Sequence, residues 1–155
     1  MKKILIAIDY DSAAKNIART GFDVARSMNA ETILLHVVIE NTYYPSTRFS
    51  PIMGFDNLSG LDTIETENIS QLEKIAEEFL EQTKNYLGDD TIQTIVQTGD
   101  YSDTIVSMAK ELNVDMIVMG THNRKGIEKM VSGSIAEKVL HNSSIPALII
   151  PPKPL

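Results

Sequence analysis

The sequence contains no cysteine, which excludes disulfide bonds, thiolate metal ligands and a cysteine nucleophile. It also lacks any apolar run approaching the roughly 20 residues that a membrane-spanning helix needs. The apolar stretch near the N-terminus stops at Asp9 after about five residues, shorter than the roughly 7–15 residues of an export signal. We therefore expect a soluble, cytoplasmic protein with no membrane partner.

The sequence has fewer basic than acidic residues, with 14 basic and 21 acidic residues and a formal net charge of −7. Nucleic acids and anionic membranes attract proteins through a positive surface, so neither is expected as a partner. Residues 120–134 are an exception, because Arg124, Lys125 and Lys129 face a single acid there, Glu128. This local contrast favours a small anionic ligand over a polyanion.

Apolar runs alternate with amphipathic segments along the whole chain, as expected when strands buried on both faces alternate with helices. The predicted strands are residues 3–8, 32–39, 91–96, 114–119 and 147–150, and the predicted helices are residues 12–28, 62–87, 102–112 and 134–141. This order predicts a single α/β domain over residues 1–155, a doubly wound, Rossmann-like sheet of five parallel strands with helices on both faces. Residues 40–61 show no sustained period, and we interpret them as a candidate lid.

Four features of the predicted helices mark where they begin and end. Asp11 or Ser12 is suited to cap the first helix and Asp100 the third, while Gly88 is a natural stop for the second. Asn113 follows the third helix directly. These residue types agree with the boundaries that the apolar periodicity predicts.

Glycines punctuate the segment between the fourth strand and the fourth helix, at Gly120, Gly126 and Gly133. Glycine lets a backbone turn sharply and approach a phosphate closely. At a helix start, unpaired amides and hydroxyls such as those of Ser132 and Ser134 favour an anion. The pattern thus describes a phosphate-binding loop, although a simple turn followed by a helix cap would use the same residues. Ligands of such sheets bind at the carboxyl ends of the strands.

The same segment carries most of a known motif, in which Gly, two residues, Gly and nine residues precede Gly and Ser or Thr. Gly120, Gly133 and Ser134 match it, and Asn123 stands at the second glycine. Asparagine tolerates the left-handed backbone better than other non-glycine residues. Together with residues 4–9, 34–38, 118–122, 133–140 and 145–147, the motif resembles that of the universal stress protein family, in its nucleotide-binding form.

This resemblance implies an adenine-nucleotide site in which Asp9 meets the adenosine part, Val37 offers its backbone to adenine, and Gly133 lies at the phosphate end. The implied site consists of Ala7, Ile8, Asp9, Val37, Met119, Gly120, Asn123, Arg124, Gly133, Ser134 and Ile135. The implied ligand is ATP, with AMP or another adenine nucleotide as alternatives, and magnesium would arrive with it. The family also implies a homodimer formed through residues 147–150.

Several assignments stay open from the sequence alone. Asp9 either binds ribose hydroxyls or caps the next helix, and Arg124 either neutralises phosphate or is a solvated loop cation. Among the histidines, His36 fits a satisfied strand residue, His141 complements a helix dipole, and His122 either touches phosphate or is exposed.

Three functional hypotheses follow. The preferred one is a dimeric, ATP-binding regulatory or sensing module without catalytic residues. The second is slow ATP hydrolysis or phosphate transfer, with Ser132 or Ser134 as acceptor. The third is a family member that binds no nucleotide and acts through protein contacts. It is suggested by Asn123, which stands in place of a glycine, and by Ala7, which stands in place of a frequent proline. No spacing predicts a metal site built by the protein alone.

Overall fold

The computed structural model describes residues 1–39, 69–121 and 134–152. Its elements are β1 (Lys3–Ala7), α1 (Ala14–Ser27), β2 (Glu31–Val38), α2 (Ile69–Leu87), β3 (Gln93–Thr98), α3 (Tyr101–Glu111), β4 (Met116–Gly120), α4 (Ser134–Asn142) and β5 (Ala147–Ile150). The expected lid at 40–61 and the first residues of the expected long helix, 62–68, lie outside the described residues. No described helix is long and apolar enough to span a bilayer.

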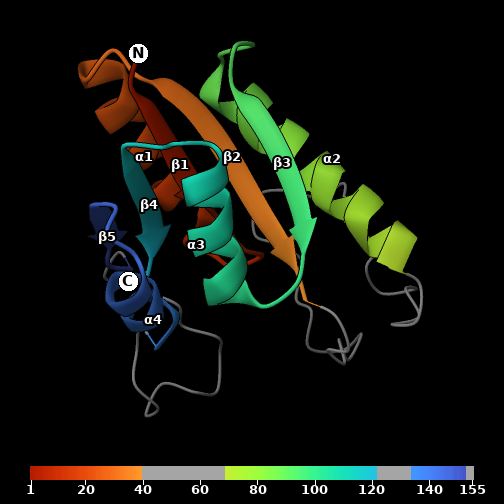
Figure 1. The fold of residues 1–155 in the computed structure, drawn as a ribbon. Coiled ribbons are helices and arrows are strands. Elements are labelled where there is room, and N and C mark those ends of the chain that lie inside the picture. The colour runs from red at the N-terminus through yellow and green to blue at the C-terminus, as the bar shows by residue number, and fades with distance from the viewer. Residues whose placement is uncertain (40–68, 122–133, 153–155) are drawn as a thin grey trace.

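The strands form one parallel sheet in the order β3-β2-β1-β4-β5 (Figure 1). The chain proceeds outward from β1 to β2 and β3, and then crosses back to place β4 on the other side of β1. The strand order therefore reverses between β1 and β4, where Ile4 pairs with Met116 and Ile6 with Val118. This confirms the predicted doubly wound α/β fold.

Strand β1 shows why the sheet needs cover on both faces. Successive side chains of a strand point to opposite faces, and Ile4, Ile6 and Ile8 pack with α1 and α2, whereas Leu5 and Ala7 pack with α3 and α4. All five side chains are buried. The unbroken apolar run that the sequence shows at residues 4–8 is thus the signature of a central, doubly covered strand.

The predicted boundary residues lie at the start of α3 and at the ends of α2 and α3. The Asp100 carboxylate accepts a hydrogen bond from the Asp103 amide at 3.1 Å and caps α3. Gly88 and Asn113 have φ values of 76° and 53°, the left-handed backbone that these residue types tolerate after a helix. The prediction for α1 was wrong by two residues, since the helix begins at Ala14 and its N-cap, Ala13, provides no side-chain cap.

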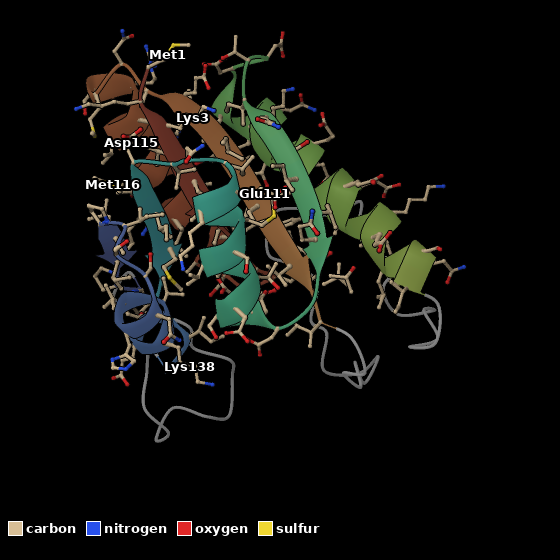
Figure 2. All side chains as sticks on the ribbon, viewed as in Figure 1. Met1, Lys3, Glu111, Asp115, Met116 and Lys138 are labelled. Carbon is tan, nitrogen blue, oxygen red and sulfur yellow. The ribbon has the colours of Figure 1, made fainter. Side chains whose placement is uncertain are left out.

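Two strands begin two residues later than predicted, β3 at Gln93 and β4 at Met116. The Asp89 carboxylate accepts hydrogen bonds from both the amide and the hydroxyl of Thr91, which holds Thr91 in a turn, and β3 starts at Gln93. Before β4, Asp115 pairs with Lys3 at the amino end of the sheet, where its carboxylate accepts from the Lys3 amide at 2.8 Å (Figure 2). This end lies opposite the predicted ligand end.

Candidate functional site

A cavity of about 360 Å³, part of it open to solvent, lies at the carboxyl ends of β1 and β4. Its lining residues are Ala7, Ile8, Asp9, Asp11, Ile17, Tyr101, Ile105, Met119, Gly120, Thr121 and Ile135. The cavity occupies the point where the strand order reverses, because α1, which follows β1, and α4, which follows β4, cover opposite faces of the sheet.

Several predicted site residues come together at this cavity. Those that line it are Ala7, Ile8, Asp9, Met119, Gly120 and Ile135. Ser134 is the first residue of α4, directly before Ile135. Val37 does not line the cavity, and its side chain is buried on the α3 face of β2. Asn123, Arg124 and Gly133 lie outside the described residues, and the binding roles of the whole set stay a prediction.

The carboxylates of Asp9 and Asp11 form a polar side of the cavity. Asp9 accepts from the Tyr10 amide at 2.7 Å, and Asp11 accepts from the Ala13 amide at 2.7 Å. A carboxylate has two oxygens with about four acceptor positions in total, so it can accept from a ligand hydroxyl in addition to its bonds within the protein. The sequence had suggested Asp11 only as a helix cap, whereas the structure also places it at the cavity.

Thr121 adds a hydroxyl to the polar side. Its amide donates to the Ile150 carbonyl at 3.2 Å, which continues the β4–β5 pairing past the end of β4. Its Oγ1 atom is buried and has no hydrogen-bond partner among residues 1–39, 69–121 and 134–152. Buried hydroxyls are nearly always paired, and a polar ligand in the cavity is one partner that would satisfy this atom.

Another wall of the cavity is largely apolar and comes from the α3 side of the sheet. Tyr101 in the first turn of α3 lies there with Ile105, one turn further on, and with Met119 of β4. An apolar wall facing a few polar groups is typical of small-molecule sites. Tyr101 and Ile105 were not predicted from the sequence, although their position just after β3 and the Asp100 cap places them near the ligand end of the sheet.

Gly120 forms the floor of the cavity together with Ile17 of α1. A Cβ atom built on Gly120 would overlap Cδ1 of Ile17 and lie 3.2 Å from its Cγ1. Any side chain at position 120 would therefore require the Ile17 side chain to rotate or shift. The close approach explains the glycine at this position without reference to the loop that follows it.

Burial raises the pKa of Asp11 from its ordinary value of 3.8 to about 6, and the charge of Asp9 adds to the effect, while the amides of Ala13 and Ala14 oppose it. The folded protein consequently binds a proton here that the unfolded chain has already lost between about pH 4 and pH 6. Asp11 therefore contributes less stability as the pH rises through this window.

We expect the Asp11→Asn variant to gain stability relative to the wild type as the pH rises from 4 to 7, by about 2–3 kcal/mol, since one pKa unit corresponds to about 1.4 kcal/mol. Asparagine keeps an oxygen that can accept from the Ala13 amide but cannot ionise. Urea denaturation of both proteins at pH 4, 5, 6 and 7 measures the difference. Equal differences at all four pH values would contradict the raised pKa of Asp11.

The chain matches the model of the universal stress protein family over residues 1–151. It is 30% identical to universal stress protein MJ0577 from Methanocaldococcus jannaschii over 153 residues, which cover 96% of this chain and 94% of that protein. The solved structure of MJ0577 superposes with a TM-score of 0.72 at 27% identity, covering 99% and 98% of the two chains.

Two more distant structures share the fold and were solved with nucleotides. One is a universal stress protein from Archaeoglobus fulgidus in complex with dAMP, with a TM-score of 0.61, 18% identity and coverage of 97% and 98%. The other is a universal stress protein in complex with cAMP, with a TM-score of 0.61, 18% identity and coverage of 96% and 95%.

Proposed function

The chain belongs to the universal stress protein family, and from this premise we propose that it binds ATP at the cavity between β1 and β4 and acts as a dimeric regulatory module. One observation carries the proposal. The cavity brings the Asp9 carboxylate, the Gly120 backbone and the first turn of α4, through Ile135, together at the reversal point of the sheet. The dAMP and cAMP complexes of related proteins support an adenine nucleotide as ligand.

The described residues fit such a ligand. The buried Thr121 hydroxyl has no polar partner among the described residues, Asp9 lines the cavity with a carboxylate that would accept from ribose hydroxyls, and the wall of Tyr101 and Ile105 suits a flat base. The first amides of a helix have no partner within the helix and favour phosphate, and α4 begins at Ser134, directly before Ile135 of the cavity. Magnesium would be held largely by the phosphates, because the described residues contain no group of three or more histidine, cysteine, aspartate or glutamate side chains that could bind a metal ion.

The place of β5 supports the dimer. It is an outer strand of the sheet, next to β4, and an edge strand presents backbone groups that can pair with another chain. A second copy of β5 across a two-fold axis would satisfy these groups in both protomers. Regulation would then follow from nucleotide-dependent changes at an interface only one strand away from the binding cavity.

Isothermal titration with ATP and magnesium tests the binding, and sedimentation with and without ATP tests the dimer. We expect saturable binding with a Kd below about 1 mM, weakened about tenfold or more by Asp9→Ala, because hydrogen bonds to a charged group contribute about 1.5–3 kcal/mol. Asp23→Ala, at an exposed carboxylate of α1 outside the cavity, is the matched control and should bind as the wild type does. No binding at millimolar ATP would remove the proposal.

A further inference from the structure

His36 is a buried histidine of β2 with only 2% of its surface exposed, and it lies beside the end of β1 rather than in the cavity. Its Nδ1 is 2.9 Å from the carbonyl oxygen of Ile8. A carbonyl oxygen only accepts hydrogen bonds, so Nδ1 carries the proton and donates it. The Ile8 amide in turn donates to Leu35 at 3.0 Å. His36 thus extends the attachment of β1 to β2 by a side-chain bond to the residue before Asp9.

The same imidazole contacts the residue after Asp9. The rings of His36 and Tyr10 have centroids 4.4 Å apart at an interplanar angle of 42°. Phe79 of α2 closes the cluster, with its centroid 4.9 Å from that of Tyr10 and 5.8 Å from that of His36, edge to face in both cases. Both neighbours of Asp9 are therefore held by one side chain, Ile8 through a hydrogen bond and Tyr10 through a ring contact.

Burial lowers the pKa of His36, against the opposing effects of the Asp9 charge and of the bond to the Ile8 carbonyl. The ring is consequently neutral at neutral pH and has a single N–H. Since that N–H is committed to Ile8, the imidazole is a structural donor whose direction is fixed, and it brings no charge to the ligand site.

We propose that His36 is a positioning residue for Asp9, which it fixes in the orientation that reads the ribose hydroxyls of the nucleotide. The inference rests on the proposed function, in which Asp9 accepts from the ribose. The proposal predicts selectivity for ribonucleotides over 2′-deoxynucleotides, because only a ribonucleotide has both hydroxyls that a well-placed carboxylate can bind. A 2′-deoxynucleotide should lose affinity in the wild type and lose less when His36 no longer holds the end of β1.

The experiment measures the ratio of the Kd values for 2′-deoxyATP and ATP in four proteins. His36→Phe keeps a ring beside Tyr10 but removes the donor, His36→Asn keeps an N–H near the position of Nδ1, and His36→Gln places its amide too far along the side chain. We expect the ratio to fall about tenfold in the Phe and Gln variants and to stay within about threefold of the wild type in the Asn variant. A ratio within one protein cancels a general loss of folded material.

The outcomes separate the two proposals. A wild type that binds neither nucleotide contradicts the proposed function itself. A wild type that binds both equally, or a His36→Phe variant with an unchanged ratio, overturns the role of His36 while ATP binding stands. If His36→Phe does not fold, the Asn and Gln pair decides, and equal ratios in these two variants overturn the inference. In the Asp9→Asn background, His36→Phe should change the ratio no further, and a further fall would also overturn it.

Discussion

Replacing Phe79 by alanine should lower the free energy of unfolding by about 3–5 kcal/mol, the usual cost of removing a fully buried phenyl ring. Phe79 is 0% exposed and belongs to the large core cluster that α1 and α2 form on one face of the sheet. Alanine would leave a cavity against Tyr10 and His36, whose rings it contacts. Urea denaturation followed by circular dichroism measures the loss.

Two further variants serve as controls for this measurement. Phe79→Leu keeps most of the buried volume and should cost less than about 1.5–2 kcal/mol. Glu78→Ala, at the exposed neighbouring position of α2, should stay within about 0.5 kcal/mol of the wild type. A loss below about 1 kcal/mol for Phe79→Ala would show that α2 does not pack on the sheet as described. Because Phe79 also contacts Tyr10, the residue after Asp9, its loss should weaken ATP binding in the protein that remains folded.

The fold could be predicted because its signals are local. The apolar run of β1 and the period of α1 can be read from a few consecutive residues, and Gly88, Asn113 and Asp100 end or cap helices through their own backbone or side chain. The boundaries that were wrong depended on side-chain bonds such as that of Asp89 to Thr91, which composition does not reveal.

The cavity could be predicted only in part. Asp9 and Gly120 follow strands, and the carboxyl ends of parallel strands meet at one edge of the sheet, so their proximity follows from the strand order. Ile17 and Tyr101 come from helices, where each was indistinguishable from an ordinary core residue. Their place at the cavity depends on how α1 and α3 cross the sheet, which is a property of the packed molecule. For the same reason the sequence identified His36 as a satisfied strand residue but gave no indication that it binds Ile8.

Gly120→Ala should destabilise the protein by about 1–3 kcal/mol, the cost of overpacking a tight contact, and should also narrow the cavity between β1 and β4. The added methyl group would overlap Cδ1 of Ile17, a residue that lines the cavity beside Gly120. Ile17 can avoid the overlap only if its side chain rotates or α1 shifts. Because α1 packs against β1 and β4, either movement disturbs other contacts in the core. Urea denaturation and titration with ATP measure the two effects in the same preparation.

The Cδ1 atom of Ile17, which the new methyl group would overlap, can be removed by a second substitution. Valine at position 17 lacks Cδ1 and keeps the rest of the isoleucine side chain. Ile17→Val alone should cost about 0.5–1.5 kcal/mol. In the double variant the new methyl group occupies the space that Cδ1 leaves, so the combined loss should be smaller than the sum of the single losses by about 1–2 kcal/mol, a coupling typical of residues in contact. ATP affinity should return with stability if the cavity is the binding site. Additive losses within about 0.5 kcal/mol would contradict the contact between Gly120 and Ile17, whereas recovered stability without recovered binding would place the nucleotide elsewhere.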